Sequence, residues 1–462
     1  MIKLFNQYFP TRKILFFAGE CIIIALAVVF SLVYHNKLNF YLQQPLLLAL
    51  KTSIIVAVYQ VSLFFSDFYT TGTTWNYRKI ILRLFVSLAL AFLIVPAAYA
   101  LTPLTLFDLN ILITIVLFVL FFLIPWRLLY NWFISSDKFK KRVLVLGSGK
   151  LARDIVREVL KDKDLSLYVL GFISNDPKLK GLSLVNPKVL GDVNDFPEIV
   201  SKEKVDKIIV AMEERRGQLP LDDLLKYKSC GIDIEDGTSF YEKITNKLLV
   251  EYLNPSQLIF CKGFELSFFN MFIKRAYDII LSIISLIIAS PLLLLISLVI
   301  KCESKGPVLF KQKRVGKDEK QFYIYKFRSM QNDAEKQTGP IMTFKGDARI
   351  TWCGKILRKT RLDELPQLWN VLKGDMSFVG PRPERPVFVS KFKKLIPYYR
   401  QRFSVRPGIT GWAQIRYNYA SSIEQTLNKL SYELYYLKNF SLLFDLSIIL
   451  RTIKVVLYAR GS

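Results

Sequence analysis

The sequence predicts a chain in three parts: an α-helical membrane bundle, an α/β Rossmann-like middle domain, and a mostly α-helical C-terminal domain. Of the 462 residues, 52% are hydrophobic, more than the ~45–50% typical of soluble domains. A strand, a glycine turn and a helix follow the apolar first third. Residues 268–462 carry 33 basic and 14 acidic side chains, most of the net charge of +26. This last part should therefore meet an anionic ligand or surface.

Four apolar stretches fill the predicted membrane region, residues 1–136. Each has about the 20 residues that a helix needs to cross a bilayer, and they are 14–33, 45–65, 80–101 and 107–129. Basic residues gather before the first stretch, between the second and third, and after the fourth. They are Lys3, Arg12, Lys13, Arg78, Lys79, Arg83, Lys138, Lys140, Lys141 and Arg142. Both ends of the bundle should therefore face the cytoplasm.

A fifth apolar run, 279–300, is long enough to be a fifth spanning helix, but two features favour a re-entrant helix over about 272–301. Its flanks are both basic, which favours the cytoplasm for each. These flanking residues are Lys274, Arg275, Lys301, Lys305, Lys311, Lys313 and Arg314. In addition, Ser290-Pro291 interrupts the run, and proline removes a helix hydrogen bond and kinks the chain. A broken helix that enters and leaves through one leaflet satisfies both observations.

The middle domain, residues 137–240, begins with a predicted buried strand, 141–146, and a turn, Gly147-Ser148-Gly149, before a helix that contains Ala152. In dinucleotide-binding folds such a turn receives a phosphate at the helix N-terminus, so Gly147, Gly149 and Ala152 are candidate nucleotide-binding residues. Many sheets keep this turn for packing alone, and no clear acidic residue ends the second strand to hold a ribose. A scaffold or regulatory role is therefore favoured. Residues 241–267 are expected to form a linker.

The C-terminal domain, residues 268–462, must work without histidine, because the only histidine is His35. The five cysteines form no CxxC pair, which argues against a disulfide framework and a structural zinc site. The densest group of candidate residues surrounds Asp363 and Glu364. Apolar residues at helical spacing and Pro366 predict that a helix starts here. Its dipole favours anions, so the helix start should keep Asp363 ionised.

An Asp-Glu pair at a helix start is most often a simple cap, but its neighbours favour a chemical role here. Arg358 and Arg361 precede the pair and Arg382 follows. Arginines suit phosphate binding, and adjacent carboxylates suit Mg²⁺ shared with substrate phosphates. A carboxylate can also attack phosphorus. The pattern therefore predicts phosphoryl-transfer chemistry.

At these residues the sequence resembles the bacterial sugar transferases that load a sugar-1-phosphate onto a polyprenyl phosphate. The resemblance covers about residues 268–462. The motifs that carry it are Lys274-Arg275 with Asp278, Ser290-Pro291, and residues 306–308, 325–328, 362–367, 374–377, 380–383 and 406–412. The four-span front end is similar to the large members of that family, which initiate exopolysaccharide or O-antigen repeat units.

The resemblance implies a monotopic catalytic domain with a re-entrant helix and a two-step mechanism with Mg²⁺, or Mn²⁺ in its place. Asp363 would attack the sugar-bearing phosphate of a UDP-sugar, UMP would leave, and undecaprenyl phosphate would take the phosphosugar. Glu364, with Asp363, would hold the metal. The implied phosphate-binding residues are Lys326, Arg358, Arg361, Arg382 and Arg416. Arg416 lies where many relatives carry an Asn-Gly-Arg-Asn stretch, so an arginine contact to the nucleotide could come from Arg416 instead or be missing. Glucose-1-phosphate is the first expectation for the sugar, and galactose-1-phosphate the second.

The implied partners are a UDP-sugar, undecaprenyl phosphate and inner-leaflet lipids, with no role for nucleic acid and a homo-oligomer left open. The implied location is the bacterial inner membrane, with the catalytic domain on the cytoplasmic face. One alternative is a nucleotide-sugar oxidoreductase or dehydratase that uses the turn at Gly147, but no Tyr-x-x-x-Lys is recognisable after that sheet. A dinucleotide-gated transport or sensing protein would need a filter-like loop, which the spans lack. An inactive assembly platform would not need Asp363, Glu364 and Arg382.

Overall fold

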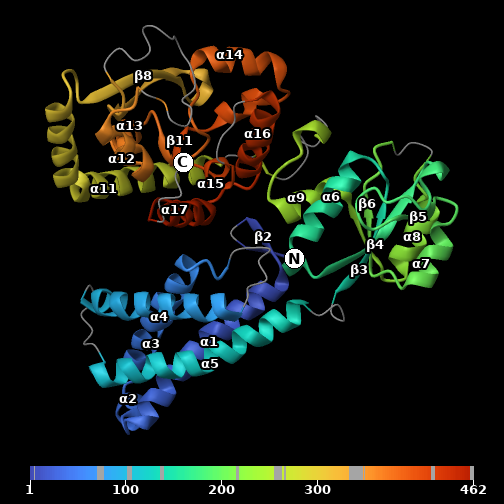
Figure 1. The fold of residues 1–462 in the computed structure, drawn as a ribbon, viewed down its shortest axis with the longest axis horizontal. Helices are drawn as coiled ribbons and strands as arrows, with labels where there is room; N and C mark the ends of the chain where they lie inside the picture. The colour runs from blue at the N-terminus through green and yellow to red at the C-terminus, as the bar shows by residue number, and fades with distance from the viewer. Residues whose placement is uncertain are drawn as a thin grey trace. The chain divides into compact units, whose positions relative to one another are not determined.

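The computed structural model describes residues 1–4, 6–69, 77–100, 107–135, 140–214, 218–253, 263–264, 267–331, 347, 349–417 and 422–457 (Figure 1). The chain divides into two compact units. One comprises residues 1–2 and 8–240, and the other comprises residues 3–7 and 241–462. The second unit therefore includes a short N-terminal piece of chain in addition to the C-terminal half.

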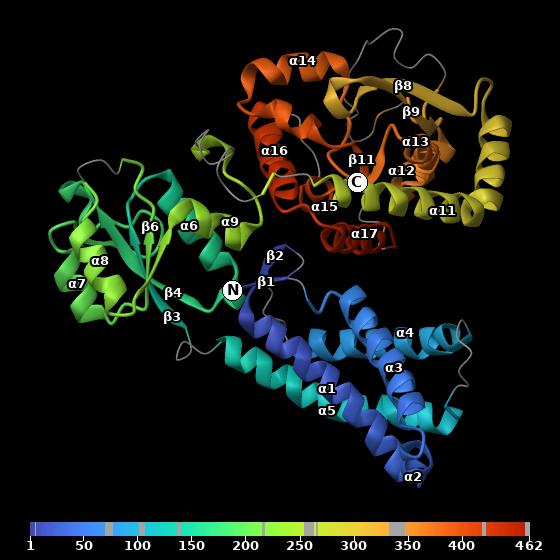
Figure 2. The ribbon, with the colours of Figure 1, turned by 180° about the vertical axis from the view of Figure 1, so that it is seen from behind.

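Four long helices form the bundle in the first unit. They are α1 (Thr11–Tyr34), α3 (Pro45–Phe65), α4 (Tyr77–Ala100) and α5 (Leu109–Ser135), with the short α2 (Leu38–Leu42) after α1 and the strands β1 (Ile2–Leu4) and β2 (Gln7–Phe9) before it. Each of the four is long and apolar enough to cross a membrane. The predicted membrane bundle is therefore confirmed, with α1 and α5 side by side in both views (Figures 1 and 2).

The middle domain is a five-stranded parallel sheet flanked by helices. Its elements are β3 (Lys141–Leu146), α6 (Lys150–Lys161), η2 (Lys163–Leu165), β4 (Leu167–Ser174), η3 (Pro177–Leu179), β5 (Val189–Asp192), α7 (Phe196–Glu203), β6 (Lys207–Val210), α8 (Leu221–Ser229), β7 (Asp233–Asp236) and α9 (Gly237–Thr245). The strand order is β5-β4-β3-β6-β7. Starting from β3, the chain adds β4 and β5 on one side of the sheet and then β6 and β7 on the other side of β3, as in a Rossmann-like sheet. This topology confirms the predicted α/β fold.

The second unit is mostly helical. It contains η4 (Val250–Tyr252), α11 (Phe268–Glu303), β8 (Leu309–Val315), η5 (Lys317–Glu319), β9 (Gln321–Phe327), α12 (Trp352–Thr360), η6 (Leu362–Glu364), α13 (Gln367–Lys373), β10 (Ser377–Val379), α14 (Pro386–Leu395), η7 (Tyr399–Ser404), β11 (Gly408–Thr410), α15 (Trp412–Arg416), α16 (Ile423–Lys438) and α17 (Leu442–Leu457). β8 and β9 form an antiparallel hairpin, and β10 pairs with β11 in parallel. These two small sheets bring distant loops together beside η6.

Helix α11 is a continuous 36-residue helix with Pro291 in its interior, and both views show it bending in its second half (Figures 1 and 2). Its first half is tied to α13, because Arg275 donates to the carbonyl oxygens of Val371 and Leu372 at 2.6 and 2.8 Å. At the other end, Arg328 donates to the carbonyl of Ser304 at 2.7 Å. Both ends of the apolar helix are therefore held by the same unit.

Part of the predicted linker is ordered against the second unit. After α9 ends at Thr245, the amide of Leu248 donates to Ser431 of α16 at 3.0 Å. Trp412 Nε1 donates to the carbonyl of Asn246 at 2.9 Å. Residues 254–262 and 265–266 of the predicted linker lie outside the described residues.

The N-terminal piece also packs on the second unit. Gln7 Nε2 donates to Ser447 Oγ at 2.7 Å, and Asn6 Nδ2 donates to the carbonyl of Phe440 at 3.3 Å. Residues that precede the first apolar helix therefore contact residues that follow the last one.

Candidate active site

The Asp-Glu pair lies on the single 3₁₀ turn η6 between two helices. Helix α12 ends at Thr360, and the next residue, Arg361, has a φ of 57°, in the left-handed region, which stops the helix. The chain then makes the turn Leu362–Glu364 before α13 begins. Asp363 and Glu364 are each only 8% exposed. The pair thus sits one short turn ahead of the helix start that the sequence predicts.

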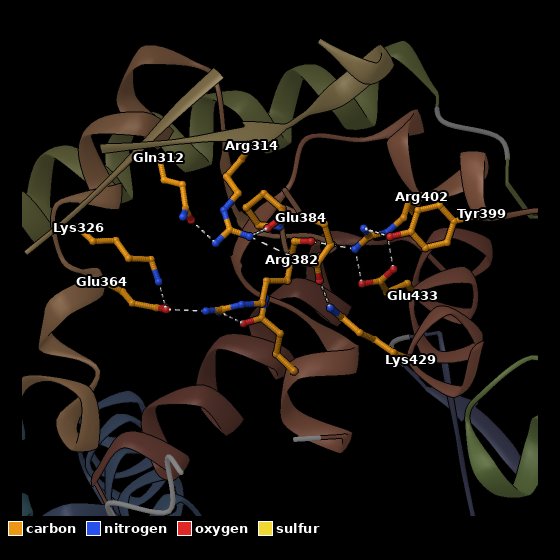
Figure 3. A network of polar contacts seen from close by, with 12 residues as sticks. Gln312, Arg314, Lys326, Glu364, Arg382, Glu384, Tyr399, Arg402, Lys429 and Glu433 are labelled. Carbon is orange, nitrogen blue, oxygen red and sulfur yellow. Dashed lines mark hydrogen bonds and ion pairs between the residues drawn. The ribbon is translucent and has the colours of Figure 1, made fainter. Parts of the chain in front are cut away.

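Glu364 bridges two cations that come from distant segments (Figure 3). Its Oε1 accepts from Lys326 Nζ of β9 at 2.8 Å and from Arg382 Nη2, after β10, at 2.9 Å. Burial of Glu364 opposes its ionisation, but the attraction of Arg382 and Lys326 is larger and holds the pKa of this carboxyl well below its ordinary value. Burial also lowers the pKa of Lys326, against the opposing pull of Glu364. Glu364 is therefore a firmly ionised counter-charge for two basic side chains.

The pKa of Asp363, unlike that of Glu364, is raised above its ordinary value. Burial raises its pKa, and the neighbouring Glu364 raises it further, while Lys326, Arg358 and Arg382 partly offset the shift. The helix start alone would lower this pKa, so burial outweighs that expected effect. Because these cations favour the ionised form of Asp363, a change in their positions or partners would change the pKa of this carboxyl.

Arg358 faces this site from the last turn of α12. Its Nε donates to Ser329 Oγ at 2.8 Å, and Ser329 itself is buried. Gly354, one turn earlier on α12, permits this approach, because a Cβ there would lie 2.1 Å from the carbonyl oxygen of Ser329. The sequence analysis did not identify Ser329, although it directly follows the 325–328 motif.

Two other predicted phosphate-binding residues have different surroundings, and Arg361 meets Glu364 through its main chain, where its carbonyl accepts from the Glu364 amide at 3.2 Å. Arg361 makes the left-handed turn, and within the described residues no ion pair or side-chain hydrogen bond of Arg361 is present. Arg416 lies over the ring of Trp412, with its guanidinium carbon 4.6 Å from the ring centroid. The structure therefore brings Lys326 and Arg382 directly to Glu364, with Arg358 near Asp363, but not the side chain of Arg361.

The loop that carries Arg382 is fixed by its main chain (Figure 3). The carbonyl of Arg382 accepts from Arg402 Nη2 at 2.8 Å, and that of Pro383 accepts from Arg314 Nη1 at 3.1 Å. The carbonyl of Glu384 accepts from the amide of Val315 at 3.0 Å. Three consecutive carbonyls are thus held, while the Arg382 side chain remains 38% exposed. This arrangement orients a solvent-accessible guanidinium toward Glu364.

Two ion pairs support that loop, one buried and one partly buried. Arg402 forms a two-bond pair with Glu433 of α16, both at 2.8 Å, and the two side chains are 2% and 3% exposed. Lys429, also on α16, pairs with Glu384 at 2.5 Å. Burial of Glu384 opposes ionisation, but Lys429 and Arg402 lower its pKa to about 2. The sequence analysis did not identify any of these four residues. In the sequence, an isolated charged residue in a strongly basic chain looks like an ordinary solvent-exposed side chain.

The donor set at Asp363 and Glu364 fits a magnesium ion shared with substrate phosphates. Within the described residues no group of three or more His, Cys, Asp or Glu side chains gathers as a metal site. Mg²⁺, however, is commonly held by one or two carboxylates together with phosphates and water. Oε1 of Glu364 is already engaged by two cations, so Oε2 of Glu364 and the carboxylate of Asp363 are the oxygens that would hold the ion.

The predicted re-entrant-helix residues form a buried polar set at the first half of α11. Lys274 pairs with Asp445 of α17 at 2.5 Å, and Asp445 also accepts from Tyr436 at 2.8 Å. Asp278 accepts from the amide of Phe378 at 3.1 Å. At the bend, Ser290 Oγ bonds only within the helix, to Ile287, and precedes Pro291. Lys274 and Asp278 therefore join α11 to α17 and to β10, both of which follow η6 in the sequence.

The glycine turn of the middle domain is tightly packed. Gly147 has a φ of +123°, and a Cβ there would lie 2.5 Å from the carbonyl oxygen of Ala211. Ala152 is completely buried. The amide of Lys150, at the start of α6, already donates to Oε1 of Glu213 at 2.9 Å, and that carboxylate also fills the space beside Gly149. A phosphate at this helix start would have to displace Glu213, which favours the scaffold hypothesis.

Comparison with known proteins finds two families along the chain. The family described as bacterial sugar transferase matches residues 269–459, and the family described as CoA-binding domain matches residues 65–225. The UDP-N-acetylgalactosamine-undecaprenyl-phosphate N-acetylgalactosaminephosphotransferase of Aeromonas hydrophila is 46% identical over 222 residues. That alignment covers 48% of this chain and 51% of the relative, so the chain spans about half the length of that protein.

Two further relatives extend the similarity. The UDP-glucose:undecaprenyl-phosphate glucose-1-phosphate transferase of Escherichia coli is 32% identical over 325 residues, covering 69% of this chain and 68% of that protein. An exopolysaccharide production protein of Rhizobium leguminosarum is 44% identical over 189 residues, covering 40% of this chain and 94% of that protein. Since the Escherichia coli relative is 32% identical over about two thirds of both proteins, and the sugar transferase family matches residues 269–459, the chain belongs to the bacterial sugar transferase family.

Proposed function

We propose that this protein transfers a sugar-1-phosphate from a UDP-sugar to undecaprenyl phosphate and releases UMP, as the first membrane step of exopolysaccharide biosynthesis. The observation that carries the proposal is the site itself: Asp363 lies beside an ionised Glu364 and among the cations Lys326, Arg358 and Arg382. Family membership supports the reaction class, because the relatives' names specify undecaprenyl-phosphate sugar phosphotransferases.

In the first step, a carboxylate oxygen of Asp363 attacks the sugar-bearing phosphorus. The bond from that phosphorus to the oxygen bridging the two phosphates breaks, and UMP leaves with the electron pair. In the second step, a phosphate oxygen of the lipid attacks the same phosphorus, and the bond to Asp363 breaks. The aspartate is thus regenerated, and the product is a lipid-linked diphospho-sugar.

The basic residues supply the charge that this chemistry needs. A carboxylate attacks a diphosphate only if cations offset the repulsion between them, and Lys326, Arg358 and Arg382 approach from three separate segments. They also favour the ionised form of Asp363, which is the form that can attack. A bound Mg²⁺ would add Lewis-acid stabilisation of the phosphate oxygens, with Glu364 and Asp363 as its protein ligands.

We also propose that α11 is re-entrant and that the catalytic domain lies on the cytoplasmic face of the inner membrane. Asn246 precedes α11, whereas its partner Trp412 follows it. Similarly, Gln7 precedes the first span and contacts Ser447 after α11. If α11 crossed the bilayer, the residues of each pair would lie on opposite sides. Because the four spans return the chain to its starting side, a helix that enters and leaves through one leaflet is consistent with both contacts.

For the sugar we propose glucose-1-phosphate, which is the group in the name of the Escherichia coli relative. The Aeromonas hydrophila relative is named for N-acetylgalactosamine instead. The sugar is therefore best decided by a panel of UDP-glucose, UDP-galactose and UDP-N-acetylgalactosamine.

The decisive experiment measures which nucleotide is released. Purified full-length protein is incubated with Mg²⁺, undecaprenyl phosphate and each UDP-sugar, and UMP and UDP are separated. We expect UMP that requires both the lipid and Asp363, with Asp363→Asn inactive. Release of UDP would mean ordinary glycosyl transfer and would overturn the proposal, as would full turnover by Asp363→Asn.

The topology has its own test by thiol labelling in sealed vesicles. In a background without native cysteines, single cysteines are placed at Ser267 and Ser304, which flank α11. A membrane-impermeant reagent should reach both from the same side. Labelling from opposite sides would show that α11 crosses the bilayer.

A further inference from the structure

Arg451 on α17 is a charged residue whose surroundings do not balance its charge. Its guanidinium carbon lies 5.3 Å from the centroid of the Trp412 ring. Within the described residues its hydrogen bond is a single long one, from Nη2 to Gln7 Oε1 at 3.4 Å, and no carboxylate pairs with it. Charges taken out of water are normally paired. The nearby Arg402 and Arg382 follow this rule, each with a glutamate.

A second arginine lies close to Arg451. Arg416 lies over the same Trp412 ring, 4.6 Å from its centroid. Burial, followed by repulsion from Arg416, lowers the pKa of Arg451 to about 9. An anion bound to Arg451 would offset this repulsion.

We propose that Arg451, with Arg416 beside it, binds the phosphate group of a membrane lipid. A guanidinium offers five N–H donors in a planar fork that matches phosphate oxygens. Arg451 is half-buried, and none of its nitrogens is among the fully enclosed, unpaired atoms of the described residues. Its uncommitted donors are therefore open to a ligand from outside the protein.

The surface of α17 indicates that this ligand is a lipid. One face of the helix exposes four large apolar side chains, between 39% and 53% exposed: Leu443, Leu446, Leu450 and Ile453. Their spacing places them along one stripe. Arg451 follows Leu450 and lies on the side of the helix that carries the buried Phe444 and Ile448, next to the stripe. An amphipathic helix with its apolar stripe in the membrane interface would bring such an arginine to the level of the headgroups.

The site is joined to the catalytic cluster through α15. This five-residue helix carries Trp412 and Arg416, and Gln414 between them accepts from Arg382 Nη1 at 3.3 Å. A lipid bound here would thus lie beside the element that contacts a proposed substrate-binding arginine. The inference goes beyond the proposed transfer reaction, because lipid binding requires no sugar donor.

The test is equilibrium binding of short-chain phosphatidic acid to detergent-solubilised full-length protein without a UDP-sugar. Because no transfer reaction is measured, the result can be interpreted even if the proposed transferase activity is wrong. We expect Arg451→Gln to bind about tenfold or more weakly, since charge-assisted bonds are lost. Arg451→Lys, which keeps the charge but not the fork, should be intermediate. Arg400→Gln is the matched control, because that side chain is 75% exposed, and it should bind as the wild type does.

Two ligand controls separate the sources of the phosphate group. Diacylglycerol with the same acyl chains lacks the phosphate and should not bind, whereas inorganic phosphate should compete only weakly. Equal affinity of wild type and Arg451→Gln for phosphatidic acid would overturn the site. Inorganic phosphate that binds as tightly as phosphatidic acid would overturn the lipid assignment. If Arg451→Gln does not fold, the affinity of Arg451→Lys for phosphatidic acid is the deciding measurement. Wild-type affinity in that variant would overturn the role of the guanidinium group.

Discussion

The ion pair of Arg402 and Glu433 should serve both stability and turnover, and substitution can separate the two. Arg402→Met leaves Glu433, only 3% exposed, without its cation. Breaking a buried pair in this way typically costs ~3–5 kcal/mol. The carbonyl of Arg382 also loses its donor, which adds about 1 kcal/mol. The free energy of unfolding of the second unit should therefore fall by about 4–6 kcal/mol.

The double variant Arg402→Met with Glu433→Leu should behave differently. Replacing both charges by apolar groups is often neutral, so most of the lost stability should return, to within about 1–2 kcal/mol of wild type. The donor to the Arg382 carbonyl is still missing, however, and the guanidinium that meets Glu364 is less firmly oriented. Turnover should therefore remain about tenfold or more below wild type, since misplaced catalytic groups are costly.

Unfolding can be followed in urea by the reactivity of Cys353, which is buried and 7% exposed, after the other four cysteines are replaced by serine. Turnover is measured as UMP release, with KM and kcat determined separately. Arg400→Met, at an exposed neighbouring arginine, controls for loss of charge. A double variant that regains both stability and kcat would refute a positioning role for Arg402. A single variant with unchanged stability would refute the ion pair.

Three further outcomes follow from the site. Because the pKa of Asp363 is raised and its ionised form attacks, kcat/KM should fall on acidification from a pH above the ordinary aspartate value of ~3.9; a pH profile flat down to that value would contradict this. Glu364→Gln should raise the Mg²⁺ concentration for half-maximal turnover at least ~10-fold, and an unchanged metal titration would exclude Glu364 as a ligand. Gly354→Ala places a Cβ 2.1 Å from the Ser329 carbonyl and should destabilise the second unit by ~1–3 kcal/mol, as measured in urea, unlike the exposed control Ser390→Ala.

The membrane helices could be predicted because length and hydropathy decide them locally. The stretch predicted at 45–65 coincides with α3, and the others differ from their helices only at the ends. The sheet of the middle domain was equally accessible, since a buried strand, a glycine turn and a helix occur in immediate succession. In each case the signal lies within about 30 consecutive residues, and no distant partner is needed to read it.

The contacts inside the catalytic unit were not accessible in this way. The local pattern places Arg361 next to Asp363, whereas Lys326, which reaches Glu364 from β9 and is 38 residues away, was implied only by the family resemblance. Glu433 lies 31 residues from Arg402, and on a helix with many charges it reads as a solvated residue. Such pairs depend on how β9, η6 and α16 pack together, which no local pattern encodes.

The double ion pair of Glu364 suggests why this site keeps a carboxylate between its two cations. Lys326 and Arg382 need a counter-charge when no phosphate is present, because partly buried charges are costly alone, and Glu364 Oε1 supplies it to both. A bound diphosphate would offer these cations new anionic partners, and a Mg²⁺ ion held with it would attract Glu364. The cations can then turn to the substrate from positions that are already held, so little reorganisation is needed at the moment of reaction. On this reasoning, Glu364→Gln frees Lys326 and Arg382 for phosphate, so its loss should appear in kcat and metal requirement rather than in the KM for the UDP-sugar.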